Sequence, residues 1–544
     1  MSERKLVLLI SGTAGAYTIR GQDLQDTIYD KGKAEGLIEQ FYINSGSRIV
    51  PESAYYIENG KKRMLLRHNR SGYPPLVTRT LEDIFDKHAI QYISIPCDTM
   101  WEKLPFEHCK VDVVCLSTTF MWSEAMIKTA IEWVRMNVDF KHLVLGGHYS
   151  SIKYAYILES FPVVDYVIIG DGETALPRLV KYLLGEETVE LSSIPNLAYM
   201  TANGIVNTPM KYEPLDTMEK VSYEGQFERL SYESVRGCAF GCKFCTWDAG
   251  IKCFRYKSAE RIIKDCEEYM GENGIKRIEI NDSTFLFPFS RIPELLEGFK
   301  RLGLHWKAHS RSDVPFDKEM VKALDESHCD ILQIGFESMT DRILKNMAKK
   351  TTVAQNRHVN EIMKGCSVDT VISFIVGFPD ETKYEFNNTY RFIVDELWGH
   401  FYIFVFEMED KSLDLWKERD RYGFELFEDE EDCLHGGSNW QHNGMTSKEA
   451  FSLRADLLKA VRNKGSMAIY KSWQSPYEWP FIPERNKEEN LKIERLLDNL
   501  VFLPCDYPSQ QVSQEVERIR KYSLQGTTQS RYLTGGVPPV RFSM

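Results

Sequence analysis

The first third of the chain alternates short apolar runs with longer amphipathic segments. Five runs have the character of buried strands that end in small or polar residues, namely KLVLLI, YISI, VDVVCLS, HLVLGG and DYVIIGDGE. The amphipathic segments Leu76–Lys87, Ser123–Val138 and Thr174–Leu184 lie between or after them and predict helices. Strands that alternate with helices predict an α/β domain with a doubly wound parallel sheet of the Rossmann or flavodoxin type.

The predicted strand ends carry small or hydroxyl-bearing residues, which allow a bulky ligand to approach the backbone. Ligands of doubly wound sheets bind at this carboxyl edge. Any single glycine here is better explained by a tight turn, but four such ends together on one edge favour a binding site. The four ends are Ser11-Gly12, Ser117-Thr118-Thr119-Phe120, Gly146-Gly147-His148 and Gly170-Asp171-Gly172-Glu173. We expect His148 in a loop, and Glu173 is also suited to cap the helix that begins at Thr174.

A second alternating series occupies the middle of the chain. Its strands are RIEIND, HWKAHSRSD, DILQIGFES, DTVISFIVGFPDET and FYIFVFE. Its helices are expected at Ala259–Asn273, Ile292–Leu302, Lys318–Glu326, Val353–Lys364 and Tyr384–Leu397. With one further strand beside a cysteine-rich loop, about six units predict a partial (β/α)6 barrel. Asp282, Arg311, Glu337 and Asp380 follow strand ends, where parallel barrels place their catalytic groups.

Three domains follow from this pattern. We expect a first domain at residues 1–200, the partial barrel at 201–420 and an α-rich C-terminal domain at 421–544 that caps the barrel and selects the substrate. The segment from about Gly185 to Tyr232 holds turn signals and short β-like runs and is expected to be a connector. In the last domain, His442 follows Trp440 and is either a proton donor or a structural histidine; the absence of a neighbouring acid–base pair in the sequence favours the second.

Composition limits the partners and the cellular location that can be expected for the protein. The net charge of −12 disfavours a nucleic-acid partner, since phosphate recognition needs a basic face. No apolar run approaches the roughly 20 residues that span a bilayer, and the run Leu6–Ile10 is too short for a secretion signal. The twelve cysteines are mostly scattered singly, which indicates reduced thiols and a cytoplasmic location.

The stretch RGCAFGCKFCTW places Cys238, Cys242 and Cys245 within eight residues, with C-x3-C-x2-C spacing. Thiolates this close can converge on one soft metal centre. Structural zinc and cubane iron–sulfur clusters usually take four protein ligands. Three ligands therefore leave one iron of a cluster open to a substrate or cofactor. Cys253 would complete a zinc site in the alternative interpretation, and unrelated structural thiols are the third.

This spacing, with Phe244 before the third cysteine, resembles the radical S-adenosylmethionine (SAM) superfamily. The motifs IEINDSTF, AHSRSD, GFESMTDRILKNMAKKTT and FIVGFPDET resemble the family's strand ends in the right order, so that the resemblance runs from Arg236 to Thr382. It implies a [4Fe-4S] cluster on the three cysteines, SAM chelated at the open iron, and a 5′-deoxyadenosyl radical.

The same resemblance implies roles for the strand-end residues. Arg311 and Glu337 would contact the carboxylate, ribose or amino group of SAM, and Asp282 lies in the motif whose backbone holds the methionine amino group. Gly377, Phe378 and Pro379 would lie on the adenine side. An ion pair between Arg311 and Glu337 that braces two strands is the alternative.

The first domain resembles the cobalamin-binding domain of cobalamin-dependent radical SAM enzymes. SGYPPLVTRTLEDIF, DVVCLSTTF, VLGGHYSS and DYVIIGDGETALPRLV carry this resemblance. It implies that Tyr73, Pro74 and Pro75 lie near the corrin. Ser117, Thr118, Thr119, Phe120, Gly146, Gly147, His148, Gly172 and Glu173 would surround the nucleotide tail.

One departure from methionine-synthase-like domains concerns their D-x-H-x-x-G motif, whose histidine ligates cobalt. The only D-x-H here is Asp86-Lys87-His88, with Gln91 where glycine is expected, and it falls at a predicted helix end. We interpret it as structural, so cobalamin would bind without a histidine ligand.

Together these resemblances imply a methyltransferase that moves a methyl group from SAM through methylcobalamin to an unactivated carbon. The substrate would be a small natural product or a peptide, and the reductant a flavodoxin or ferredoxin. Three alternatives stay open: the same architecture with epimerisation, ring contraction or dehydration; a first domain without cobalamin; and an iron–sulfur or zinc protein for binding or electron transfer. Arg311 and Glu337 count against the last.

Overall fold

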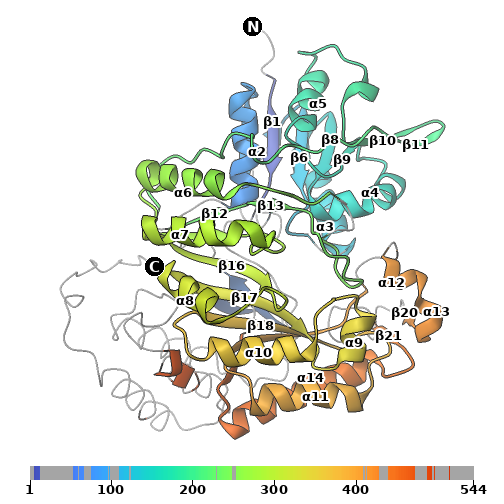
Figure 1. Ribbon diagram of the computed structural model, residues 1–544. Helices are drawn as coiled ribbons and strands as arrows, with labels where there is room; N and C mark the ends of the chain where they lie inside the picture. Colours follow the sequence, from blue (N-terminus) through green and yellow to red (C-terminus); the bar gives the residue numbers. More distant parts are fainter. Residues whose placement is uncertain are drawn as a thin grey trace.

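The computed structural model describes residues 5–12, 53–58, 61–66, 75–95, 97, 109–121, 124–227, 229–247, 253–408, 411, 413–427 and 439–471, with isolated residues between 487 and 514. These residues form two seven-stranded sheets, one from each alternating series. In Figure 1 the first sheet lies above the second, and the short strand β13 (Val235–Arg236) lies between them.

The first sheet has the order β11-β10-β9-β8-β6-β1-β4. Its five parallel strands follow the chain order 2-1-3-4-5, which is the flavodoxin-like arrangement. Two antiparallel strands extend it, so the segment expected as a connector contributes to the sheet; that expectation was wrong for residues 197–207. The bounds are β1 Val7–Ile10, β4 Tyr92–Ile95, β6 Val113–Ser117, β8 His142–Gly146, β9 Tyr166–Ile168, β10 Leu197–Thr201 and β11 Gly204–Asn207.

Helices cover both faces of this sheet. Along β1, Leu8 and Ile10 pack into one buried cluster while Val7 and Leu9 pack into another, as a doubly wound sheet requires. The helices are α2 Leu76–Lys87, α3 Glu124–Asn137, α4 His148–Ser160 and α5 Ala175–Leu183. Because α4 begins at His148, the expectation of a loop at that residue was wrong. Its buried positions include Ser150 and Ser151, so no apolar periodicity marks it in the sequence.

The second sheet is parallel throughout, with the order β12-β15-β16-β17-β18-β19-β22. Among the described residues, no pairing joins β12 to β22, so the sheet stays open. Its seventh strand comes from beyond residue 420 and was not predicted; the boundaries at residues 200 and 420 stay predictions. The bounds are β12 Arg229–Tyr232, β15 Arg277–Ile280, β16 His305–Arg311, β17 Cys329–Glu337, β18 Asp369–Val376, β19 Gly399–Val405 and β22 Ala468–Tyr470.

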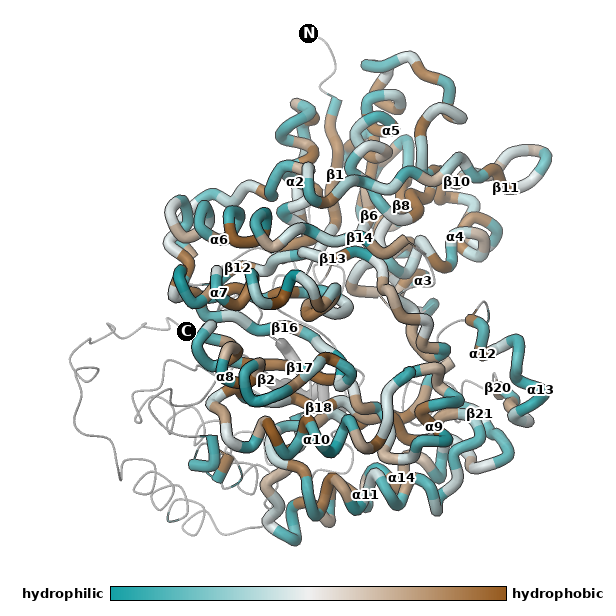
Figure 2. Tube along the Cα trace, in the orientation of Figure 1, coloured by the Kyte–Doolittle hydropathy of each residue, from teal (hydrophilic) through white to brown (hydrophobic). Residues whose placement is uncertain are grey.

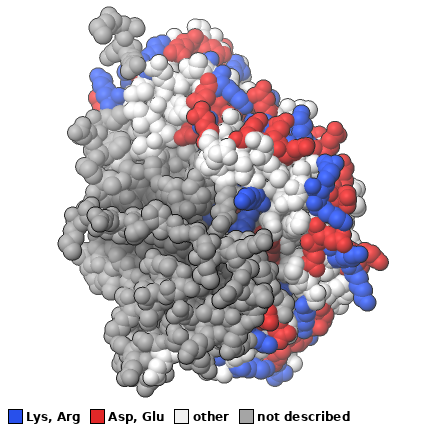
Figure 3. Space-filling model, turned by 90° about the vertical axis from the view of Figure 1, so that its left-hand side faces the viewer, with Lys and Arg blue, Asp and Glu red and all other residues white. Residues whose placement is uncertain are grey.

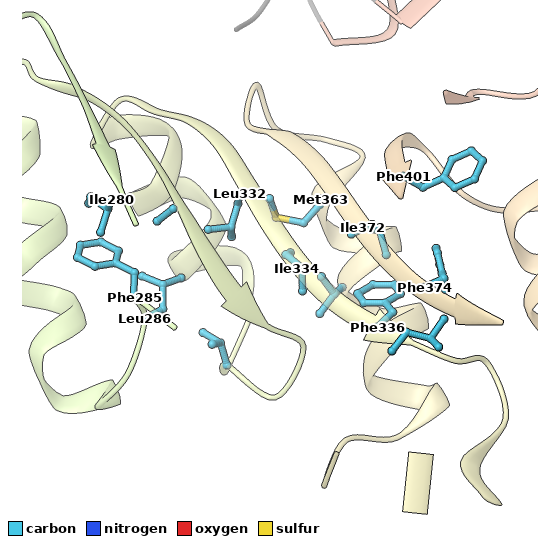
Figure 4. Packing of buried hydrophobic residues seen from close by; sticks show 14 of the residues in the cluster. Ile280, Phe285, Leu286, Leu332, Ile334, Phe336, Met363, Ile372, Phe374 and Phe401 are labelled. Carbon is cyan, nitrogen blue, oxygen red and sulfur yellow. The ribbon is translucent and has the colours of Figure 1, made fainter. Parts of the chain in front are cut away.

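Side chains that point outward from this sheet pack against its covering helices. Along β17, Leu332, Ile334 and Phe336 join the large core, and Figure 4 shows them beside Ile372 and Phe374 of β18. The alternate positions of β17 carry Gln333, Gly335 and Glu337 and face the concave side. The helices are α6 Ala259–Asn273, α7 Ile292–Leu302, α8 Lys318–Glu326, α9 Asp341–Asn346, α10 Val353–Met363, α11 Lys383–Asp395 and α14 Ser447–Lys464.

Smaller elements complete the description. A short hairpin pairs β13 with β14 (Arg255–Tyr256) around the three-cysteine segment. The others are β2 Ser53–Glu58, β3 Lys61–Leu66, β5 Cys109–Lys110, β7 Val138–Asp139, α12 Asp414–Lys417, α13 Arg419–Tyr422, β20 Glu425–Phe427 and β21 Asn439–Gln441.

The surface and the core differ as expected for a globular protein. Figure 2 shows apolar residues concentrated in the strands and polar residues along the outer helices. On the described part of the face in Figure 3, lysine and arginine side chains are interspersed with aspartate and glutamate side chains. In the part of the chain that the structure covers, no helix combines the length and apolarity needed to cross a membrane.

The core of the second sheet depends strongly on Trp306 of β16. Its side chain is fully buried against Phe285 and Phe299, and its indole N–H donates to the Ser327 carbonyl at 2.8 Å. We expect Trp306→Ala to lower the free energy of unfolding by about 3–5 kcal/mol, measured by urea denaturation. Tyr384→Ala is the control, since Tyr384 is 82% exposed and should leave stability within about 0.5 kcal/mol. Equal midpoints for the two variants would contradict this assignment of the core.

Candidate active site

The three-cysteine segment is held at its base by Asp282, the second residue after β15. The buried Asp282 carboxylate accepts hydrogen bonds from the amides of Ser234 and Val235, at 2.7 and 3.0 Å, and from the Ser234 hydroxyl. Burial raises its pKa to about 6, although the hydrogen bonds from Ser234 oppose this shift. Asp282 therefore fixes the point at which the chain leaves β12 for the cysteines.

Cys238, Cys242 and Cys245 are half-buried, and none is in a disulfide. Burial raises the pKa of Cys238, and that of Cys245 to about 12, while Cys242 adds electrostatic repulsion to both thiolates. The Cys245 amide donates to the Cys242 carbonyl at 3.1 Å, which keeps these two residues on one turn. Among the described side chains, however, no three His, Cys, Asp or Glu are already arranged to hold a metal ion.

The donor chemistry of the segment nevertheless fits an iron–sulfur cluster. Three soft thiolate ligands on one short loop match three irons of a cubane, and a bound cation would lower the thiol pKa values. Ligation by these three cysteines stays a prediction.

Arg311, the last residue of β16, lies directly beside this loop. Its guanidinium forms two hydrogen bonds of 2.9 Å with Asp313 and lies 3.7 Å from the centre of the Phe240 ring. It also lies 3.7 Å from the Cys242 sulfur. Burial alone would lower the pKa of Arg311, but Asp313 and Cys242 raise it. The site thus keeps a permanent positive charge next to the cysteines.

Glu337, at the end of β17, faces the same space. Its carboxylate accepts hydrogen bonds from Lys349 at 2.9 Å and Ser373 at 3.3 Å, and its φ of 63° is in the left-handed region. A Cβ on Gly335 would lie 2.3 Å from this carboxylate, so a larger residue there would displace the Glu337 side chain. The Lys349 ammonium also lies 6.0 Å from the centre of the Phe244 ring.

The alternative of an ion pair between Arg311 and Glu337 was wrong, because each has another partner. Arg311 pairs with Asp313, and Glu337 pairs with Lys349. Neither partner was predicted as a site residue. Their only signal in the sequence is a charge of opposite sign two and twelve positions after the strand-end residue.

The loop after β18 contacts the C-terminal region. Gly377 has a φ of 83°, and a Cβ there would lie 2.5 Å from the Trp440 ring, while Phe378 is fully buried. His442 stacks on Trp440 and donates from Nε2 to the Gly377 carbonyl at 3.2 Å. Burial lowers the pKa of His442 to about 4. A neutral, backbone-bonded His442 favours the structural interpretation.

Asp380 follows this loop, and its contacts are with residues outside the cysteine segment. Its carboxylate pairs with Arg342, on a side of the loop exposed to solvent, and its amide donates to Nδ1 of His442 at 3.2 Å. We therefore do not retain Asp380 as a candidate catalytic residue.

On the first sheet, the described residues that directly follow β1, β6 and β8 lie at one edge. The Thr118 hydroxyl contacts the Gly146 carbonyl at 2.9 Å and the Ser150 hydroxyl at 2.7 Å, and Ser117 contacts Thr119 at 3.2 Å. Gly147 has a φ of 98°, and a Cβ there would lie 2.8 Å from the Thr119 amide.

A similar close approach joins the end of β1 to the start of α2. A Cβ on Gly12 would lie 2.2 Å from the Thr78 hydroxyl and 3.0 Å from the Pro75 ring. Pro75 therefore lies at this edge with the other predicted residues, among which Phe120 is half-buried. This small-residue edge fits a large cofactor. Tyr73 and Pro74 lie outside the described residues.

The cysteine hairpin meets this edge of the first sheet. His148 of α4 lies 6.2 Å, between ring centroids, from Trp247 of the hairpin. In the loop after β9, the two acidic residues on either side of Gly172 also contact the hairpin. Asp171 pairs with Arg236 at 3.2 Å and with Arg255, and Glu173 pairs with Arg236 at 2.6 Å. Helix α5 begins after Thr174 without a side-chain cap, so Glu173 is turned toward the hairpin instead of the helix.

Asp86-Lys87-His88 lies away from this edge, at the carboxyl end of α2. Asp86 pairs with Arg79 at 2.6 Å, Lys87 pairs with Asp83 at 2.8 Å, and His88 ends the helix. Because α2 runs back toward the start of β4, these residues lie at the opposite edge of the sheet. The contacts support the structural interpretation.

Comparison with known proteins gives a consistent result. Residues 232–393 match the radical SAM superfamily. An uncharacterized methyltransferase of Pyrococcus horikoshii is 29% identical over 293 residues, which cover 51% of this chain and 62% of that protein. The anaerobic magnesium-protoporphyrin IX monomethyl ester cyclase of Cereibacter sphaeroides is 25% identical over 303 residues, 52% of this chain and 49% of that protein. The chain thus spans about half to three fifths of these relatives.

Among solved structures, the radical SAM methyltransferase TsrM of Kitasatospora setae, with cobalamin and a [4Fe-4S] cluster bound, has a similar fold. The TM-score is 0.58 at 12% identity, and the similarity covers 96% of this chain and 100% of TsrM. The cysteine loop and strands β15 to β18 lie within the residues that match the radical SAM superfamily, and the fold of the chain is similar to that of TsrM.

Proposed function

We propose that this protein is a cobalamin-dependent radical SAM methyltransferase, which transfers a methyl group to an unactivated carbon of a small natural product or a peptide. One observation carries the proposal. The cysteine hairpin lies between the carboxyl edges of the parallel strands of the two sheets, with Arg311 of the second sheet on one side and His148 and Asp171 of the first on the other.

Different residues would bind the different groups at the carboxyl edges of the two sheets. Cys238, Cys242 and Cys245 would hold the cluster, and the loops after β1, β6 and β8 would hold cobalamin. When bound, these groups supply reductive cleavage of SAM and a transferable methyl group. Arg311 provides a fixed positive charge for the SAM carboxylate, and Glu337 provides hydrogen-bond acceptors for its amino or hydroxyl groups.

Two independent observations support the proposal that the first sheet binds cobalamin. The first is the flavodoxin-like order of the sheet, with small residues at the carboxyl edge beside the switch between β1 and β6. The second is the fold shared with TsrM, whose structure contains cobalamin. The position of Asp86-Lys87-His88 at the other edge supports binding without a histidine ligand to cobalt.

A second outcome is favoured by one of the relatives. The Cereibacter sphaeroides protein is named as a cyclase, so a radical enzyme with this architecture that forms a ring, or that epimerises, contracts or dehydrates its substrate, is the other candidate. The name of the Pyrococcus horikoshii relative favours methyl transfer.

The test is anaerobic purification with iron and cobalamin supplied, followed by counts of iron, sulfide and cobalamin per chain. We expect about four irons and one cobalamin. Reduction with SAM should then yield 5′-deoxyadenosine, and SAM labelled in its methyl group should label the product. A cluster that forms 5′-deoxyadenosine without retained cobalamin would overturn the methyltransferase proposal in favour of a radical enzyme with a different first domain.

The cluster ligands can be tested against a matched cysteine. We expect Cys238→Ala, Cys242→Ala and Cys245→Ala each to abolish 5′-deoxyadenosine formation and to lose the cluster absorbance, because two thiolates cannot replace three. Cys253→Ala is the control and should keep about four irons per chain. Loss of the metal in Cys253→Ala would favour the zinc alternative.

Glu337→Gln tests the SAM contact. The substitution removes the negative charge that faces the site and is expected to weaken SAM binding about tenfold to a hundredfold, as loss of a charged hydrogen bond does. Titration of SAM against the reduced cluster by electron paramagnetic resonance measures this directly. Iron content should not change. Glu361→Gln, on an exposed position of α10, should bind SAM like the parent chain; unchanged binding in Glu337→Gln would remove Glu337 from the site.

A further inference from the structure

We infer that Asp171 is a positioning residue through which the first sheet sets the geometry of the cysteine hairpin. Asp171 lies in the loop that follows β9, and 4% of its surface is exposed. The hairpin belongs to the second half of the molecule, so Asp171, together with Glu173, links the loop after β9 of the first sheet to this hairpin.

The need for a negative charge at this point comes from the hairpin itself. Arg236 of β13 and Arg255 of β14 occupy directly opposite positions in the antiparallel pair. Like charges at opposite positions destabilise such a pair. Both guanidinium groups are also largely buried, which leaves little water to screen their repulsion.

Asp171 is placed to neutralise both groups. Its Oδ1 lies 3.2 Å from Nη1 of Arg236 and accepts from Nη2 of Arg255 at 3.2 Å, while Oδ2 accepts from Nη1 of Arg255. Oδ2 also accepts from the Glu213 amide at 2.8 Å, which fixes the carboxylate. Arg255 and Arg236 together lower the pKa of Asp171, against the effect of burial.

The two arginines depend on Asp171 to different degrees. Arg236 also pairs with Glu173 at 2.6 Å and with Glu233 at 2.9 Å. Within the described part of the chain, Asp171 is the sole carboxylate that forms an ion pair with Arg255, whose Nε is buried without a partner. Removal of the charge on Asp171 would therefore leave Arg255 opposite Arg236 without a counterion.

The position of the arginines connects this pair to the cysteines. Arg236 precedes Cys238 by two residues, and Arg255 closes the other strand of the same hairpin. If the β13–β14 pairing opens between Arg236 and Arg255, the two ends of the loop that carries all three cysteines are no longer held together. The inference rests on the proposed function only in assuming that a cluster assembles on this loop.

Asp171→Asn in the full chain is the first test, because it keeps the shape of the side chain and removes its charge. We expect the reconstituted cluster to lose iron to a chelator about tenfold faster than in the parent chain, since breaking a buried ion pair is costly. The shift that SAM causes in the electron paramagnetic resonance spectrum of the reduced cluster should also change. Arg79→Gln is the matched control: Arg79 donates to the Ser222 carbonyl at 2.7 Å, another contact between the two halves, but away from the hairpin.

The double variant Asp171→Asn/Arg255→Gln separates charge balance from simple packing. Removing one guanidinium relieves the repulsion, so the double variant should regain most of the iron retention and of the SAM-dependent spectral shift. An Asp171→Asn variant that matches the parent chain would overturn the inference. So would a defect that Arg255→Gln does not relieve, because it would show that Asp171 serves only packing.

A measurement without metal makes the result independent of the proposed function. In the metal-free chain, hydrogen exchange of residues 235–256 is expected to be faster in Asp171→Asn than in the parent chain. In the double variant it is expected to be slower than in Asp171→Asn. If the parent chain binds no cluster, the proposed function fails while this ordering still supports the inference. If the parent chain binds a cluster and all variants exchange alike, the inference fails while the proposed function stands.

Discussion

A parallel sheet places the carboxyl ends of all its strands at one edge, and this molecule turns two such edges toward each other. The cysteine hairpin occupies the space between them, with Trp247 against His148 and Cys242 beside Arg311. Groups that react with one another must be held within a few ångströms, which neither edge achieves alone. The strand order of each sheet and the small residues at the strand ends both serve this one arrangement.

Buried charges hold the arrangement in place, and each has a specific partner. Asp282 receives three hydrogen bonds at the base of the hairpin, Glu337 pairs with Lys349 at the end of β17, and Asp171 joins two arginines. Such pairs contribute little net stability, because desolvation offsets their attraction. They do fix directions, since a buried charge tolerates few alternative positions. The apolar core stabilises the fold, and these pairs set the geometry of the site.

The strands could be predicted from the sequence because both sheets are covered on their outer faces, so β6 or β18 forms a nearly continuous apolar run. The cysteines could be predicted because their spacing is local. Helix α4 could not, because its buried Ser150 and Ser151 bond to the neighbouring loops instead of forming an apolar stripe. The partner of Asp171 lies 84 residues away, and no local pattern indicates a contact of that range. Residues of the site were therefore predictable, but their pairings were not.

The edge strand β22 gives synthesis of the chain a definite order. The first sheet is complete when Asn207 of β11 has left the ribosome, whereas the second sheet waits for Ala468–Tyr470. At about 5–20 residues per second, those 260 or so residues take roughly 13–50 s to make. Once β19 (Gly399–Val405) has been made, its outer edge has no neighbouring strand until β22 follows, while the carboxyl edge of the first sheet is already formed. A cofactor that binds the first sheet can thus be in place before the barrel that will face it exists.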